Sequence, residues 1–288
     1  MKRILLSLAL MLPFCTWAQM HHEIGLTAGV SNYYGDLQNK IFADYGYKPM
    51  GGIYYKYFMS PHVGIRMGFN FTQVTAGDSL SDIQVNKYRN LSFATAIAEC
   101  YAALELNLLP IDINRMKVTP YIFGGIGAFY YDPYTLGLKG EKVFLRPLGT
   151  EGQGVPNYPD RKTYSHVSAC FPFGGGLKFL IGNTLVVTTE IGFRYTNTDY
   201  LDDVSKSYVN LDTLAKYKGK QSADLSYRGG SVPGADPDYY PDYKFQRGDS
   251  KSNDWYWFGN VGIAVYFRAF GNRRLGYIHC PRFFKPWH

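Results

Sequence analysis

The sequence predicts an all-β fold: an eight-stranded antiparallel β-barrel that spans a membrane, with short turns at one end and long loops at the other. Three observations predict it. Tyrosine and glycine are abundant, with 26 and 31 residues among 288. Apolar and polar residues alternate with a period of two in one segment after another, as in barrel strands. The connections between these segments are short and long in turn, which is typical of outer-membrane barrels.

The N-terminus has the form of a secretory signal peptide. Two basic residues precede the apolar run ILLSLALMLPF, and Ala18 stands where cleavage is expected. We therefore expect residues 1–18 to be removed on export. Beyond them no run of roughly 18 apolar residues occurs, so a transmembrane helix is not expected. A closed barrel is the other structure that satisfies its backbone in lipid.

Eight segments fit the strand pattern. The clearest is TLVVTTEIGFRYT, in which Ile191 and Phe193 share one face while Glu190 and Arg194 share the other. The strands are expected near residues 23–31, 49–59, 63–72, 91–109, 118–131, 166–181, 184–196 and 254–268. Eight is an even number, as single-chain bacterial barrels require.

The fourth segment is the least regular. LSFATAIAECYAALELNLLP suits an amphipathic helix on propensity alone. Leu104 and Leu106 nevertheless alternate with Glu105 and Asn107, and losing this strand would break the even count. The parity shifts near Glu99, which predicts a β-bulge there.

The lengths of the connections predict which end of the barrel faces which side of the membrane. Those at 60–62, 110–117 and 182–183 are short and are expected to face the periplasm, with both chain termini, in a Gram-negative outer membrane. Those at 32–48, 76–90, 132–165 and 199–253 are long and are expected to be extracellular. The last has nine Asp and the run PDYYPDY, and is long enough to form a partly ordered cap. Its spacing matches no EF-hand, so no metal site is expected.

Charged residues occur on the inward parity of several strands. A barrel of eight strands is filled by its own side chains, so these charges should pair into a plug rather than line a pore. The expected interior network comprises Lys56, Arg66, Glu99, Glu105, Lys178, Glu190 and Arg194.

No catalytic residues and no cofactor are expected. Only His166 stands near the outer rim at a strand end, and no G-x-S-x-G motif occurs. A small lipid-modifying enzyme acting through His166 is the weakest of the alternatives.

The chain continues past the last strand. Residues 268–288 carry five basic residues and no acid, together with aromatic side chains. We expect residues 19–268 to form the barrel and 269–288 a periplasmic tail that binds a partner. Three cysteines remain after the signal peptide, and Cys280 is the best placed for an intermolecular disulfide. The expected partner-binding residues are Arg273, Arg274, Tyr277, Cys280, Pro281, Arg282 and Phe283.

Two short motifs carry a family resemblance. With the eight-strand pattern, SNYYGDLQ at 31–38 and CPRF at 280–283 resemble the PorG-like outer-membrane barrels of the type IX secretion system, a DUF6089-like family. The resemblance implies a non-enzymatic subunit that anchors the secretion apparatus in outer-membrane lipid. It also implies docking to a periplasmic ring made of a lipoprotein and its partner, and no nucleic acid. The alternative is a surface-binding or adhesion barrel that acts through loops 132–165 and 199–253.

Overall fold

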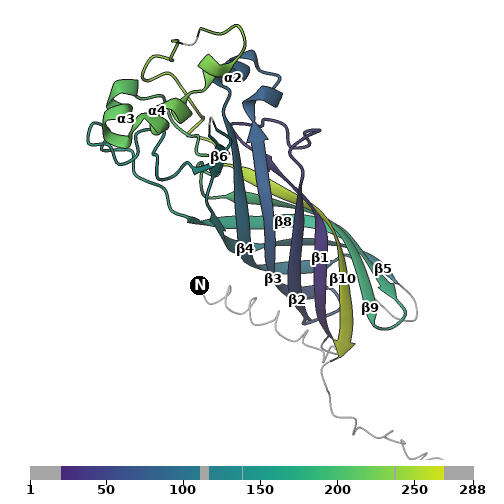
Figure 1. Cartoon of the computed structure of the whole chain (residues 1–288). Coiled ribbons are helices and arrows are strands. Elements are labelled where there is room, and N and C mark those ends of the chain that lie inside the picture. Colours follow the sequence, from purple (N-terminus) through teal and green to yellow (C-terminus); the bar gives the residue numbers. More distant parts are fainter. Residues whose placement is uncertain (1–20, 111–116, 138, 237, 269–288) are drawn as a thin grey trace, which may run out of the picture.

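Eight long antiparallel strands form the body of the protein (Figure 1). The computed structural model describes residues 21–110, 117–137, 139–236 and 238–268. The expected signal peptide and the expected tail at 269–288 lie outside them. The strands are β1 (His21–Tyr34), β2 (Lys48–Phe58), β3 (Val63–Gly77), β4 (Ser92–Asn107), β5 (Val118–Tyr131), β8 (Val167–Ile181), β9 (Leu185–Thr196) and β10 (Trp255–Arg268).

The sheet closes on itself. Its order is β3-β2-β1-β10-β9-β8-β5-β4, and β3 also pairs with β4. The first and last strands of the barrel pair along their whole length, from His21 opposite Arg268 to Tyr34 opposite Trp255. Closure leaves none of the eight strands with an unpaired edge, which is what a backbone in hydrocarbon requires. The predicted eight-stranded antiparallel barrel is confirmed.

The fourth strand contradicts one prediction. The pairing of β3 with β4 runs without interruption from Val63 opposite Leu106 to Gly77 opposite Ser92, so the bulge expected near Glu99 is wrong. The apparent shift of parity has another cause. Phe93 and Ile97 point inward on the same face as Glu99, because the interior changes from charged to apolar along this strand.

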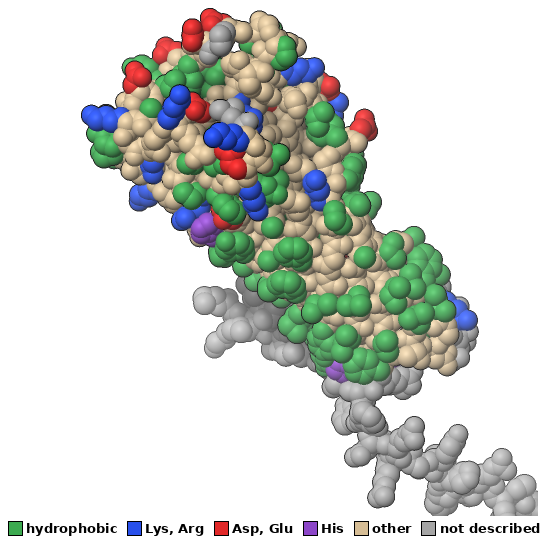
Figure 2. Space-filling model, viewed as in Figure 1, with side chains coloured by type: hydrophobic (Ala, Val, Ile, Leu, Met, Phe, Trp, Pro, Cys, Tyr) green, Lys and Arg blue, Asp and Glu red, His purple; other side chains and the backbone are tan. Residues whose placement is uncertain are grey.

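The outer face of the barrel is apolar. Side chains of the outward parity are largely exposed, such as Leu26 at 65%, Ile126 at 66% and Ile263 at 57%. They form a hydrophobic surface on the barrel, whereas charged side chains gather over the opposite end of the molecule (Figure 2). An apolar outer surface on a closed barrel is the signature of a strand-built membrane span, and the fold is that of an outer-membrane β-barrel. Within the described residues, no helix has the length and apolar character needed to cross a membrane.

The long connections fold into a cap at one end of the barrel (Figure 1). The strands β6 (Tyr134–Leu136) and β7 (Lys142–Phe144) form a hairpin that pairs with β4 beyond the barrel wall. The remaining elements are η2 (Asp78–Leu80), α2 (Gln84–Arg89), α3 (Leu211–Lys218), α4 (Lys220–Ser226) and η3 (Gly229–Ser231). The Asn210 side chain caps α3 by accepting a hydrogen bond from the Thr213 amide at 2.8 Å.

The main apolar core lies where barrel and cap meet. It joins strand residues such as Tyr33, Ile97 and Phe258 with cap residues such as Leu37 and Leu201, all essentially inaccessible to solvent. Burial of this apolar surface stabilises the end of the barrel that adjoins the cap. The cap is therefore part of one folded unit with the barrel rather than a set of separate loops.

Candidate functional site

A set of charged side chains with no net charge occupies the part of the barrel interior away from the cap. The structure places all seven residues of the expected interior network inside the barrel, and it adds Glu23 from β1. None of the eight is more than 5% exposed. Four are basic and four acidic, so the net formal charge is zero. They are Glu23, Lys56, Arg66, Glu99, Glu105, Lys178, Glu190 and Arg194.

Four of these side chains form a closed group near one end. The Lys178 ammonium lies 2.7 Å from Glu105 Oε1 and 3.3 Å from Glu23 Oε1. The Lys56 ammonium lies 2.7 Å from Glu105 Oε2 and 3.8 Å from Glu23 Oε2. The Lys56–Glu105 contact is a close ion pair that lacks the alignment of a hydrogen bond. Each carboxylate therefore faces two ammonium groups.

A second group lies deeper in the barrel. Arg66 makes a two-pronged ion pair with Glu190, one prong of which, from Nη2 to Oε1, measures 3.1 Å. The Arg66 Nε donates to the Tyr101 hydroxyl at 2.7 Å, and the Tyr121 hydroxyl donates to Glu190 at 2.8 Å. Paired, hydrogen-bonded charges of this kind tolerate burial, whereas unpaired charges do not.

The third group surrounds Glu99. Its carboxylate accepts from Arg194 Nε at 3.2 Å, from Asn70 at 2.8 Å and from the Tyr256 hydroxyl at 2.6 Å. The Arg194 guanidinium lies over the Phe258 ring at 4.1 Å. Above this level the core is apolar. Charged groups and then aromatic side chains thus fill successive levels of the interior.

Sequence reasoning missed Glu23, although two signals pointed to it. The seven listed charges sum to +1, which calls for one more acid in a sealed interior. Ile24 and Leu26 point outward in β1, so strict alternation places Glu23 inside.

The motif SNYYGDLQ joins the barrel to the cap. The Tyr33 hydroxyl lies 2.7 Å from a carboxylate oxygen of Asp202 and 2.7 Å from one of Asp254. Gln38 donates to the Tyr33 carbonyl at 2.6 Å, and Asp36 accepts two hydrogen bonds from the Asp249 amide. This motif, which carried the family resemblance, therefore has a structural role at the end of the barrel opposite His21 and Arg268.

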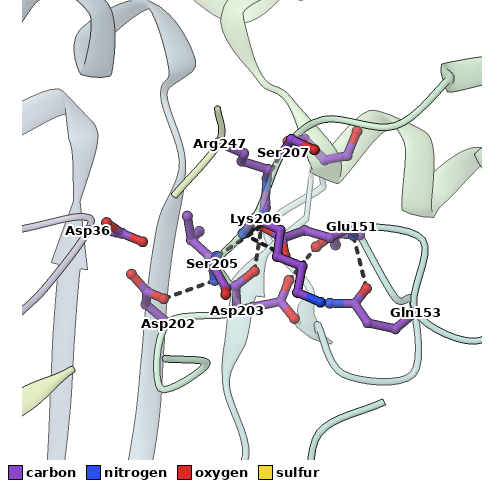
Figure 3. A network of polar contacts seen from close by, with 12 residues as sticks. Asp36, Glu151, Gln153, Asp202, Asp203, Ser205, Lys206, Ser207 and Arg247 are labelled. Carbon is purple, nitrogen blue, oxygen red and sulfur yellow. Dashed lines mark hydrogen bonds and ion pairs between the residues drawn. The ribbon is translucent and has the colours of Figure 1, made fainter. Parts of the chain in front are cut away.

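Buried acids and Arg247 organise the centre of the cap (Figure 3). Arg247 donates to Glu151 at 3.0 Å and to the Asp203 carbonyl at 2.7 Å, while Glu151 also accepts from the Ser205 and Lys206 amides. In the described chain no group of three His, Cys, Asp or Glu residues has an arrangement that could hold a metal.

Several acidic side chains of the cap have pKa values raised above their ordinary range. Burial raises the pKa of Asp203 to about 6, although Arg247 opposes the shift. Burial raises the pKa of Asp254 to about 8 and that of Asp199 to about 9. Tyr33 carries one hydroxyl proton but lies against two carboxylates, so protonation of one carboxyl gives every contact in this triad a proton.

The other predicted residues divide between described and undescribed parts. Cys100 faces outward and Cys170 inward, and both are free thiols. The partner-binding residues expected between Arg273 and Phe283 lie outside the described residues. The His166 ring stacks on Tyr130 and lies 3.7 Å from Asp132, and no serine or cysteine nucleophile is among the contacts found for it.

Comparison with known proteins identifies a family over the N-terminal half. Residues 2–144 match the family described as a domain of unknown function, DUF6089. This stretch belongs to the DUF6089 family. The DUF6089 match ends at β7, so it covers β1 to β7 and the SNYYGDLQ motif. Strands β8 to β10, which close the barrel, and the CPRF motif follow it.

Solved barrels are similar at low identity, and no curated protein matches the chain. Neisserial surface protein A has 8% identity and a TM-score of 0.40, covering 87% of this chain and 98% of its own. OprG from Pseudomonas aeruginosa has 10% identity and a TM-score of 0.39, covering 88% and 97%. Ail, the attachment invasion locus protein of Yersinia pestis, has 11% identity and a TM-score of 0.39, covering 86% and 99%.

Proposed function

We propose that this protein is a non-enzymatic structural subunit that anchors a type IX-like secretion apparatus in the outer membrane. The observation that supports it best is the charge-balanced, fully buried interior. Eight paired charges and an apolar core above them fill the lumen, so the barrel suits a membrane anchor better than a diffusion channel. Its contacts with other proteins are then made at its two ends.

The proposed docking end is the one with the short turns. There the end of β10 is held by aromatic packing, since the Phe267 ring stacks on His22 at 5.4 Å and His22 also contacts Tyr57 at 5.3 Å. The basic segment 269–288 follows directly from this strand. In the proposed orientation it lies in the periplasm, where Arg273, Arg274 and Tyr277 bind a ring lipoprotein and its partner. Cys280 is available there for a disulfide.

Deletion of residues 269–288 tests this function. The shortened barrel should still insert and show heat-modifiable mobility on gels, because β10 is complete, but it should no longer co-purify with periplasmic partners after gentle detergent extraction. A Cys280→Ser variant separates the disulfide from the docking, since it should remove only a higher band on non-reducing gels. Unchanged partner recovery by the deleted protein would rule out docking through the tail.

A second candidate function is ligand binding at the outer surface. The specific observation that favours it is the ordered cap, because a folded, hydrogen-bonded cap presents a fixed surface. Deleting part of loop 199–253 while keeping the tail separates the two functions. Loss of activity in the loop variant alone would favour the surface role.

A further inference from the structure

A cavity in the cap stands apart from the proposed anchor function. It has a volume of about 820 Å³ and lies between the segment after β1, the helix α2 and residues 227–249. This volume is in the range of small-molecule sites, roughly 300–1,000 Å³. The run PDYYPDY, at 237–243, supplies Tyr239 and Pro241 to its wall. These two residues therefore form part of a concave surface.

Tyrosines dominate one wall. Tyr227 lies edge to face with Tyr208 at 5.9 Å, with Tyr239 at 6.0 Å and with Tyr240 at 5.8 Å, which holds the rings in fixed positions. Tyr239 is 56% exposed, so its ring is accessible to a ligand. Tyr208 is only 5% exposed and lines the cavity, and its hydroxyl can both donate and accept a hydrogen bond. A ligand in the cavity can therefore make a hydrogen bond to this hydroxyl.

The charge of the cavity selects against anions. Arg89 and Arg247 line it, but both are already paired. Arg89 donates twice to the Asp78 carboxylate at 2.7 Å, and Arg247 donates to Glu151 at 3.0 Å. The lining carboxylates of Asp36, Asp236 and Asp249 face no further basic residue in the cavity wall. The remaining charge is negative, so phosphate, sulfate and acidic sugars are repelled.

The remaining wall supplies uncharged hydrogen-bonding groups. Asn39, Asn86 and Gln246 offer amide donors and acceptors beside the tyrosines. An apolar ligand would leave these amides and the carboxylates unpaired, and a single ammonium group would occupy a small part of the volume. A sugar ring fits both parts of this wall. Its apolar face of C–H groups can lie against the tyrosine rings, and its hydroxyls can donate to and accept from the amides and carboxylates.

We propose that this cavity binds an uncharged saccharide chain, with a sugar face against Tyr239 and a sugar hydroxyl on the Tyr208 hydroxyl. The full chain, folded in a detergent without a sugar headgroup, is titrated calorimetrically with maltotriose, cellotriose and tri-N-acetylchitotriose. A sulfated disaccharide and trilysine serve as charged comparators. At least one uncharged trisaccharide should bind, and more tightly than both comparators.

Three single variants locate the site. Tyr239→Ala should weaken binding about tenfold, because it removes the exposed ring. Tyr208→Phe should weaken binding about threefold to tenfold, because it removes one hydroxyl and keeps the ring packing. Tyr243→Ala is the matched control, since Tyr243 is exposed in the same run but does not line the cavity, and it should leave binding unchanged.

Heat-modifiable mobility and resistance of the cap to protease establish that each variant is folded. The proposal is overturned if no uncharged trisaccharide binds at millimolar concentration, or if only the sulfated sugar or trilysine binds. Binding that survives Tyr239→Ala and Tyr208→Phe in folded protein would equally overturn it.

Discussion

Substitution of Glu105 by glutamine tests whether the barrel interior is sealed. Glu105 is the closest acid to both ammonium groups of its group, at 2.7 Å from Lys56 and 2.7 Å from Lys178. After Glu105→Gln both ammonium groups depend on Glu23, at 3.8 Å and 3.3 Å. One buried positive charge then lacks a counter-charge. Breaking a buried pair from one side costs about 3–5 kcal/mol.

The assay is urea unfolding of the protein in lipid vesicles, followed by tryptophan fluorescence and by heat-modifiable mobility. The double variant Glu105→Gln, Lys56→Met restores the charge balance and should recover most of the lost stability. Lys40→Gln is a surface control, because the Lys40–Asp82 pair is exposed and its loss should leave the urea midpoint unchanged.

A Glu105→Gln protein as stable as the wild type would refute the reasoning. It would mean that water and ions reach the part of the barrel interior around Glu105 and screen its charges. Conductance in planar bilayers would then distinguish an open lumen from a closed one, and an open lumen would remove the main support for the anchor function.

Three further predictions concern the cap. Tyr33→Phe removes the hydroxyl shared by two carboxylates and should destabilise the cap by about 1–3 kcal/mol, seen as faster proteolysis within 199–254 while the barrel stays heat-modifiable. The pKa of Asp254 is about 8 in the folded cap and about 4 when unfolded, so the acid form favours folding. The protection factors of the cap amides, which correct for the intrinsic pH dependence of hydrogen exchange, should fall as pH rises from about 4 to about 8 and change little beyond. Arg247→Met leaves the buried Glu151 carboxylate without its cation and should cost the cap about 3–5 kcal/mol, whereas conservative Arg247→Lys should cost less, measured by the urea midpoint of cap cleavage.

The barrel was predictable from the sequence because its environment imposes a period. Lipid on one side and a filled lumen on the other force residues such as Ile191 and Glu190 to alternate, and the eight strands follow from that pattern. The same alternation places Glu23 inside the barrel. It was missed because the first strand was judged by its apolar residues alone. The false bulge near Glu99 arose from equating the interior with polar residues, while Phe93 and Ile97 also point inward.

The cap was not predictable in the same way. Its contacts join residues distant in sequence, such as Arg247 with Glu151 and Asn90 with Ser231, and no periodicity marks them. The cavity and its tyrosine wall appear only when loops from three connections meet. PDYYPDY was visible as a run, but its orientation relative to α2 is a property of the folded loops.

The contact between Tyr33 and Asp254 spans the seam at which the cylinder closes. Tyr33 stands near the end of the first strand and Asp254 directly before the last, so the two meet once synthesis is complete and these strands have zipped together. Loop 199–254 is anchored at the same point through Leu201, whose amide donates to Asp254. Folding of the cap is therefore completed late, after the barrel has closed, and a chain stalled before its final strand would have an incomplete cap.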